Sequence, residues 1–159
     1  MTHMVSLYSA RAALEEGSLT ISSSAVKAGI SKSLDQWQES IKTAYYDATR
    51  SPQPQHLYKE VLLACALAGV DDKSFFTAAA VRGPLRIVAE RDDLDIPNFA
   101  RHLKEMSEQR RGGILVREGE TRRLRYRFVN PLMRPYVIMR GVADGLLTNE
   151  KRDAISSIS

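Results

Sequence analysis

The sequence predicts a mainly α-helical protein with one β-hairpin in its second half. Apolar residues recur at spacings of three and four over most of the chain, as in half-buried helices. Between residues 114 and 128 the period changes to two, as in a pair of strands. The chain has 159 residues, of which 43% are hydrophobic and 26% charged. This composition is typical of one globular domain or two small helical ones, and it excludes a wholly disordered chain.

Three helices are predicted within residues 1–50, which we assign to a helical subdomain. The first contains Leu7 and Leu14 and stops at Gly17, because glycine is favoured just after a helix. The serines at positions 22–24 cap a short second helix that ends near residue 33. The third helix is longer and amphipathic. Its apolar face consists of Leu34, Trp37, Ile41, Tyr45 and Ala48.

A stiff joint is predicted at residues 51–55. Pro52 and Pro54 stand at alternate positions there, and two prolines so placed hold the chain extended and cannot continue a helix. The segment is too short for a flexible linker. We therefore expect two packed units, the second of which spans residues 56–147.

Three further helices are predicted between residues 56 and 111. The first runs from about 56 to 68 and is followed by a loop or turn that contains Phe75 and Phe76. The second lies within residues 84–90, because proline is favoured at the first position of a helix. The third begins at Pro97 and ends near Arg111, with Phe99, Leu103 and Met106 as its buried stripe. Its outward residues are Asn98, Arg101, Glu105 and Glu108.

A hairpin follows, with strands at 114–117 and 123–128. In the second strand an apolar set (Leu124, Tyr126 and Phe128) alternates with Arg123, Arg125 and Arg127, so the two sets lie on opposite faces. A last helix is predicted from 135 to 147, and a frayed tail over 148–159. Three helices followed by a hairpin form the layout of a winged helix-turn-helix. The predicted fold class is therefore a helical bundle, a winged helix-turn-helix and a C-terminal helix.

The positive charge is concentrated in one block. The formal net charge is +4, yet residues 1–96 carry 10 basic and 12 acidic side chains. Residues 97–141 carry 11 basic side chains, all but one of them arginine, against 4 glutamates. Arginine presents a planar fork of donors that suits phosphate, so a nucleic-acid interface is the first functional interpretation. A solubilising surface is the alternative.

Nine residues are the candidates for contact with double-stranded DNA. They are Asn98, Arg101, Arg110, Arg111, Arg117, Arg122, Arg123, Arg125 and Arg127. Arg123, Arg125 and Arg127 stand at every second position of one predicted strand. They therefore form a face about 13 Å long, which can follow a phosphate backbone. Only Asn98 and Arg101 suit base edges, so we expect weakly sequence-specific binding. Alternatively, the arginines pair with acidic residues of a partner domain or subunit.

The sequence contains none of the motifs that would make the chain an enzyme. No G-x-x-x-x-G-K-[ST] or G-x-G-x-x-G is present, and the histidines and Cys65 lack metal-ligand spacing. We therefore expect no catalysis, metal or cofactor in this chain. One cysteine cannot form an internal disulfide, and neither a signal sequence nor a run of about 20 apolar residues is present. These features indicate a cytoplasmic location without a membrane partner.

Several short stretches resemble a known family. In the first half they are Thr2-His3-Met4, Ala12-Ala13-Leu14, Glu16-Gly17, Leu19-Thr20-Ile21, Gln38-Glu39-Ser40-Ile41, Ala44-Tyr45 and Ala48-Thr49. In the second half they are His102-Leu103, Arg111-Gly112, Arg125-Tyr126-Arg127-Phe128, Asn130-Pro131-Leu132-Met133 and Pro135-Tyr136-Val137-Ile138-Met139. With these residues the chain resembles, over about residues 2–147, the lid and winged helix of bacterial AAA-type ATPases related to the origin-recognition and archaeal initiator class.

The resemblance implies a parent ATPase of which this chain is the C-terminal part. Such ATPases carry a P-loop, an acidic Mg²⁺-organising motif and a sensor arginine ahead of the lid, and these residues contain none of them. Met1 falls where a lid helix should already have begun, so we expect a piece of a larger protein. ATP and Mg²⁺ then belong to the missing ATPase core, which becomes a partner of the chain in an oligomeric full-length protein. ATP binding would move the lid, and through the joint the winged helix.

Two alternatives remain open from the sequence. The chain is a free-standing winged-helix transcription regulator, in which residues 1–50 form a dimerisation bundle. Or it is a winged-helix interaction module, whose arginines bind an acidic protein.

Overall fold

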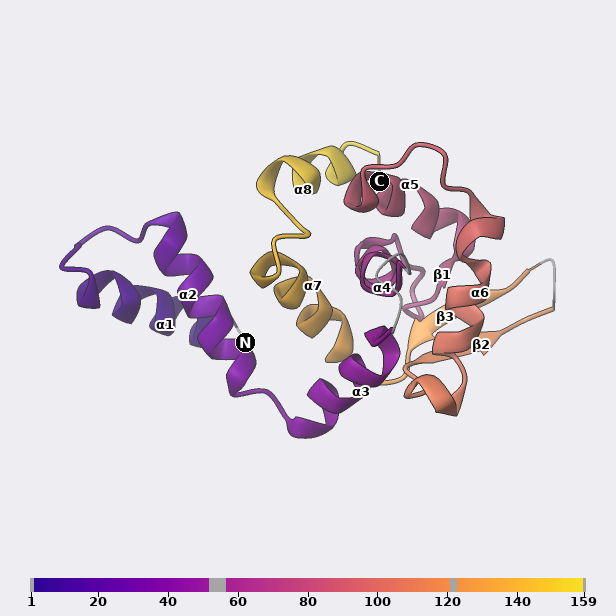
Figure 1. Cartoon of the computed structure of the whole chain (residues 1–159), viewed down its shortest axis with the longest axis horizontal. Coiled ribbons are helices and arrows are strands. Elements are labelled where there is room, and N and C mark those ends of the chain that lie inside the picture. The colour runs from indigo at the N-terminus through magenta and orange to yellow at the C-terminus, as the bar shows by residue number, and fades with distance from the viewer. Residues whose placement is uncertain (1, 52–56, 121–122, 159) are drawn as a thin grey trace.

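The computed structural model describes residues 2–51, 57–120 and 123–158. Within them the fold is mainly helical with one small antiparallel sheet (Figure 1), which confirms the mainly helical class predicted from the sequence. The predicted joint at residues 51–55 lies outside the described residues, apart from Ser51. No helix in these described ranges has the length and apolar character needed to cross a membrane.

Helices α1 (Thr2–Glu15) and α2 (Ser23–Asp35) form a helical hairpin that projects from the rest of the molecule (Figure 1). As predicted, the Ser22 side chain caps α2 by accepting the backbone N–H of Ala25 at 3.1 Å. The two helices approach closely at Gly29, where a Cβ atom would lie 2.6 Å from the backbone nitrogen of Ser9. Any larger residue would force the helices apart at this point.

The third helix is shorter than the sequence predicts. Helix α3 spans Glu39–Thr49, and Leu34 belongs instead to the end of α2. The chain leaves the helical conformation around Trp37, whose ring meets that of Tyr136 edge-on with 5.2 Å between centroids. Tyr45 contacts the same ring at 5.5 Å. The break lets α2 and α3 both pack on helix α7 (Met133–Ala143), on which Tyr136 lies.

Helix α4 (Tyr58–Leu67) is the centre of the second half (Figure 1). Its residues from Val61 to Ala66 are all buried, which is the expected environment for a helix that is apolar on every side. Helices α5 (Ala78–Ala89), α6 (Ile96–Met106) and α7 surround it. Helices α6 and α5 and the small sheet close the core on the side away from α7 (Figure 1).

The sheet has three strands in the order β1-β3-β2. Strands β2 (Leu115–Glu118) and β3 (Arg125–Phe128) form the predicted hairpin. Strand β1 (Phe76–Thr77) pairs antiparallel with β3, with Phe76 opposite Tyr126. The predicted loop at Phe75 and Phe76 is therefore wrong in part: Phe76 enters the sheet because its ring stacks on that of Tyr126 and packs at a tilt against that of Phe128.

Two predicted helix boundaries are also wrong. Helix α5 begins at Ala78, six residues before Pro84, because the Thr77 side chain caps it by accepting the N–H of Ala80 at 3.2 Å. Pro84 stands inside the helix, buried in the core. Helix α6 ends at Met106, and residues Gln109–Arg111 form a separate 3₁₀ turn, η1.

The C-terminal segment is ordered rather than frayed. Helix α7 ends at Ala143, and residues Asn149–Ser156 form a further helix, α8, which begins after a cap by Thr148. Ile155 is buried. The Lys151 ammonium donates to the carbonyl of Val88 at 3.0 Å and pairs with Glu90 at 2.7 Å. A cation at the C-terminal end of α5 is favoured by the helix dipole. Lys151 therefore attaches α8 to α5, although the composition of this segment predicted no helix here.

Candidate nucleic-acid interface

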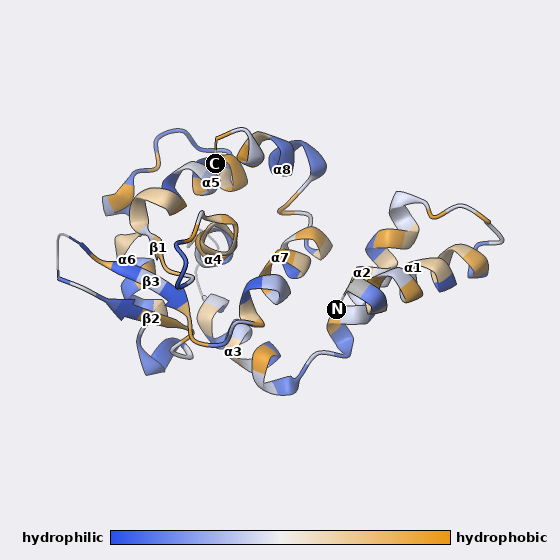
Figure 2. Cartoon of the chain, turned by 180° about the vertical axis from the view of Figure 1, so that it is seen from behind, coloured by the Kyte–Doolittle hydropathy of each residue, from blue (hydrophilic) through white to orange (hydrophobic). Residues whose placement is uncertain are grey.

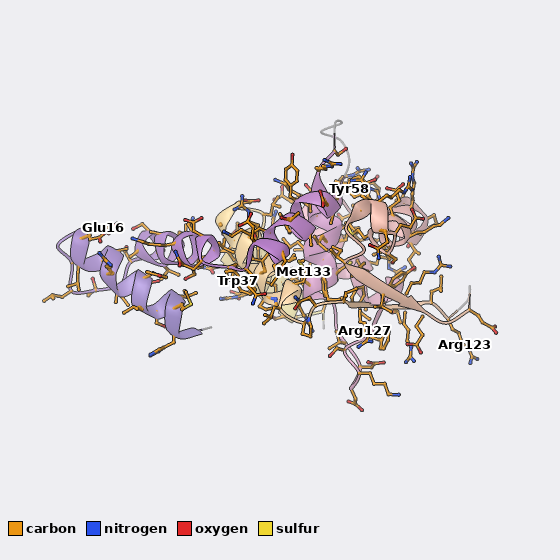
Figure 3. All side chains as sticks on the ribbon, turned by 90° about the horizontal axis from the view of Figure 1, so that it is seen from below. Glu16, Trp37, Tyr58, Arg123, Arg127 and Met133 are labelled. Atoms are coloured by element: carbon orange, nitrogen blue, oxygen red, sulfur yellow. The ribbon has the colours of Figure 1, made fainter. Side chains whose placement is uncertain are left out.

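The hairpin presents its arginines as the alternation predicts. Tyr126 and Phe128 are buried against the core, whereas Arg123 and Arg127 are exposed on the other face. Arg117 on β2 is exposed as well. Figure 2 shows β2 and β3 as a largely hydrophilic ribbon, and Figure 3 shows Arg123 and Arg127 along the end of the molecule opposite to Glu16. Arg122 lies outside the described residues.

Arg125 differs from the arginines on either side of it. Its guanidinium contacts Glu118, its cross-strand neighbour, at 2.7 Å and Asp71 at 3.5 Å. Among the described residues, no carboxylate lies within 4.0 Å of Arg117, Arg123 or Arg127. The free positive charge of the hairpin therefore belongs mainly to these three arginines.

Phe75 supports this face, a role that the sequence did not predict. The Arg125 guanidinium lies 4.5 Å from the centre of the Phe75 ring and that of Arg127 lies 5.2 Å from it. Phe75 itself is buried, so its ring forms a cation–π platform for both guanidinium groups. Asp71 holds the preceding loop: it accepts the backbone N–H groups of Phe75 and Lys73, and these bonds lower the pKa of its carboxyl.

The two candidates for base contact on α6 are partly engaged within the chain. The Asn98 side-chain oxygen accepts the backbone N–H of Asp95 at 2.8 Å, as one half of a capping box. The Arg101 side chain is 82% exposed, but its Nε contacts Glu105 at 2.7 Å. Both residues lie on the outer surface as predicted, with reduced capacity to bind another group.

Glu105 is buried, contrary to the outward position predicted for it. Its side chain is 7% exposed and has Arg101, Arg110 and Arg111 within 4.0 Å. The Tyr58 hydroxyl also donates to Oε2 of this carboxylate. The Tyr58 hydrogen bond, followed by that of Arg101, lowers the pKa of Glu105 to about 2. The carboxylate is therefore ionised at neutral pH and lies at the centre of a cationic cluster.

Arg111 is part of this cluster and is largely covered. Its side chain is 19% exposed. The guanidinium lies 3.8 Å from the centre of the Tyr58 ring and donates to the backbone carbonyl of Arg50 at 2.6 Å. Arg111 therefore links η1 to α4 and to Arg50, which directly follows α3, and its role as a DNA contact stays a prediction. Arg110 stays 68% exposed, with its Nε at 2.6 Å from Glu108.

Some of these ion pairs could be predicted from the sequence. Arg101 and Glu105 are four residues apart on a helix, which places them side by side. Glu118 and Arg125 follow from the hairpin register. The contact of Glu105 with Tyr58 joins residues 47 positions apart, and no local pattern indicates it.

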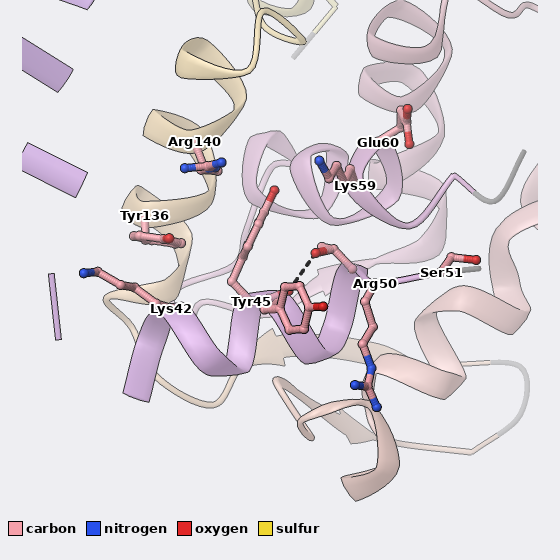
Figure 4. A pocket seen from close by; sticks show the side chains of 10 residues that line it. Lys42, Tyr45, Arg50, Ser51, Lys59, Glu60, Tyr136 and Arg140 are labelled. Carbon is pink, nitrogen blue, oxygen red and sulfur yellow. Dashed lines mark hydrogen bonds between the residues drawn. The ribbon is translucent and has the colours of Figure 1, made fainter. Parts of the chain in front are cut away.

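A larger cavity lies away from the hairpin. A cleft of about 740 Å³ opens between α3, the start of α4, and α7, and Figure 4 shows Tyr45 reaching into the space between Arg140 and Lys59. Both of these cations pair with Asp144, at 3.2 and 3.6 Å. Lys59 and Arg140 are therefore compensated within the chain, whereas Arg50, which also lines the cleft, has no carboxylate of the described residues within 4.0 Å.

Comparison of the chain with family models, curated proteins and solved structures finds no match.

Proposed function

We propose that the region from α4 to α7 is a winged helix-turn-helix that binds double-stranded DNA, mainly through the phosphate backbone. The observation that carries the proposal is the set of exposed arginines on the hairpin: Arg117, Arg123 and Arg127, with no carboxylate of the described residues within 4.0 Å. Arginines of this kind displace the counterions of DNA, and that release supplies most of the affinity.

The order of the elements supports the fold assignment. A helix, a short strand, two helices and a hairpin follow one another as α4, β1, α5, α6 and β2–β3. The first strand pairs with the last, which gives the sheet order β1-β3-β2. Under this proposal α6 is the recognition helix and the hairpin is the wing.

Weak sequence specificity is part of the proposal. Base contacts discriminate between sequences, whereas phosphate contacts position the protein on the duplex. On α6, Asn98 is used in a cap and Arg101 contacts Glu105. The phosphate contacts of the hairpin therefore dominate over base contacts from α6.

A salt series tests the proposal. Binding of a labelled duplex of about 20 base pairs is measured across salt concentrations for the unaltered chain and for the double variant Arg123→Gln/Arg127→Gln. We expect the slope of log K against log salt to become shallower by about 0.9 for each lost contact. Arg152→Gln is the matched control, because Arg152 is 62% exposed on α8. Equal slopes for all three proteins would refute the assignment and favour a protein partner for the arginines.

We also propose that α1, α2 and α3 are the lid of a bacterial cytoplasmic AAA-type ATPase whose core binds ATP and Mg²⁺ ahead of this chain. The support is the sequence resemblance over both halves. The α1–α2 hairpin also exposes large apolar side chains, such as Leu7 and Leu14, each 65% exposed. Exposed apolar surface of this kind marks an interface, and an ATPase core would cover it. The chain itself is then non-catalytic.

The reading frame upstream of Met1 in the source genome tests this second proposal. Continuation into a P-loop is the expected result. A stop codon there would favour the regulator alternative, in which the same apolar side chains form a dimer interface. Light scattering of the purified chain separates the two further, since the regulator would be a stable dimer and the ATPase fragment mostly a monomer.

A further inference from the structure

A small pocket lies beside the hairpin, and neither the DNA interface nor the core accounts for it. Its volume is about 160 Å³, and the end of α4, the loop before β1, the end of β3 and the start of α7 enclose it. Cys65, Phe76 and Phe128 contribute the buried, apolar part of its lining. Val70 and Val129 also line it and are 40% and 57% exposed. The pocket therefore combines an apolar floor with an open, apolar rim.

Three cations line the same pocket: Lys73, Arg127 and Arg134. None of the lining residues is acidic, and in the described part of the chain no carboxylate lies within 4.0 Å of these three side chains. In the loop before β1, Asp71 has both carboxylate oxygens engaged, one by backbone N–H groups and the other by Arg125. In the larger cleft at α7, by contrast, Asp144 pairs with two of the lining cations, Lys59 and Arg140.

The frame of the pocket is fixed before any ligand arrives. Arg134 donates to the carbonyls of Ala66 and Ala68 at the end of α4, at 2.8 and 3.0 Å. Ser74 adopts a left-handed backbone conformation with φ of 63°, which is uncommon for a residue other than glycine. Its N–H donates to the carbonyl of Asp71 at 2.9 Å. A pocket held in this way loses little conformational freedom on binding, which favours affinity.

We propose that this pocket binds a small organic anion, with a compact apolar body on the Phe76 and Phe128 floor and a carboxylate between Lys73 and Arg127. Its size suits one ring, because an apolar cavity of about 150 Å³ accommodates benzene. Like charges gathered on a low-dielectric surface attract a counter-ion. A convergent set of polar groups at an apolar pocket is also the usual form of a small-molecule site.

Occupancy would also affect the hairpin, a consequence that rests on the proposed function. Arg127 belongs both to the pocket and to the proposed phosphate-binding face. A carboxylate bound next to its guanidinium neutralises one of the three charges available to DNA. The anion therefore acts as a weak negative effector of DNA binding.

Direct titration without DNA tests the site. Benzoate, its uncharged analogue benzamide, and acetate, which lacks the ring, are titrated against the whole chain and followed by amide chemical shifts in NMR spectra. We expect benzoate to bind with a Kd on the order of 1 mM and the other two probes to bind at least about threefold more weakly. Equal binding of benzoate and acetate would overturn the proposal.

Variants locate the binding. Lys73→Met removes one charge but keeps an apolar stem, and we expect it to weaken benzoate binding about threefold. Val70→Trp fills the pocket without changing its charge and should abolish the binding. Lys104→Met, on exposed α6 surface outside the pocket lining, is the control. Undiminished benzoate binding by the first two variants would show that the site lies elsewhere.

A competition experiment separates this proposal from the proposed function. Duplex affinity is measured with and without benzoate at constant ionic strength, and we expect a loss of about twofold to threefold. If benzoate binds in the pocket and the chain binds no duplex, the proposed function fails and the pocket stands. If the duplex binds in the salt-dependent manner and benzoate does not bind, only the pocket assignment fails.

Discussion

The arginines after α6 and those of the hairpin are close in the sequence and differ in their surroundings. Arg111 is half-buried and contacts Glu105, the Tyr58 ring and the backbone carbonyl of Arg50 just after α3. Arg127, sixteen positions later, lies exposed above a phenylalanine ring. Both arginines lie over an aromatic ring, so the difference is the carboxylate: Glu105 makes Arg111 a structural link, whereas Arg127 has no carboxylate of the described residues within 4.0 Å and keeps its charge available. The number of arginines in this region therefore overstates how many are available at the interface. The groups around each arginine decide its role.

Among the changes that test this difference, loss of the Glu105 carboxylate should have the largest effect on the free energy of unfolding. Glu105→Gln leaves Arg111 half-buried beside a neutral group, and we expect the free energy of unfolding to fall by about 3 kcal/mol. Urea unfolding followed by circular dichroism measures it. Glu108→Gln is the matched control, because that side chain is 36% exposed and should change stability by less than about 0.5 kcal/mol. Equal midpoints for the two variants would contradict the structural role of Glu105.

Acid titration should reveal the same carboxylate with a somewhat smaller effect. The pKa of Glu105 is about 2 in the folded protein and near its ordinary value of 4.5 when unfolded. Its contribution is therefore complete above about pH 5 and is lost as the pH falls through 2. We expect the unaltered protein to lose up to about 3 kcal/mol more than Glu105→Gln between pH 6 and pH 2. Other carboxylates are common to both proteins, so parallel pH curves would argue against a paired Glu105.

The same substitution made in each of the two arginine classes should give the smallest change in the free energy of unfolding and the most specific result. Arg111→Gln should lower the free energy of unfolding by about 1 kcal/mol and leave the salt dependence of DNA binding unchanged. Arg127→Gln should do the reverse, with unaltered stability and a DNA affinity about fivefold lower at 0.1 M salt. Urea unfolding and duplex titration of each variant give its free energy of unfolding and its DNA affinity. If both variants lost DNA affinity equally, the distinction between a structural and an exposed arginine would be wrong.

The parts of the fold that the sequence predicted are those with a local cause. The alternation from Arg123 to Phe128 predicts its own two faces, because a strand has a period of two. Serine caps and glycine stops likewise act on adjacent residues. Strand β1 has two residues, too few to show a period, and it exists through pairing with β3. Helix α8 is nearly all polar and is fastened by Lys151 and Ile155 to α5.

The candidate site follows the same division. Exposed Arg123 and Arg127 follow from the strand pattern, whereas the Phe75 platform depends on the loop before β1 folding back over β3. The Glu105 cluster joins α4, α6 and η1, so its members are separated along the chain. Electrostatic compensation of this kind is a property of the tertiary structure. An arginine-rich sequence alone therefore could not distinguish Arg111 from Arg127.

The aromatic contact at the start of α3 gives the molecule an optical reporter. Trp37 is the only tryptophan in the chain, and it stands where α2 ends, edge-on to Tyr136 of α7. Movement of the α1–α2 hairpin relative to α7 would change the polarity around the indole and shift its emission. The intrinsic fluorescence of the unlabelled protein therefore reports on the contact between the end of α2 and α7.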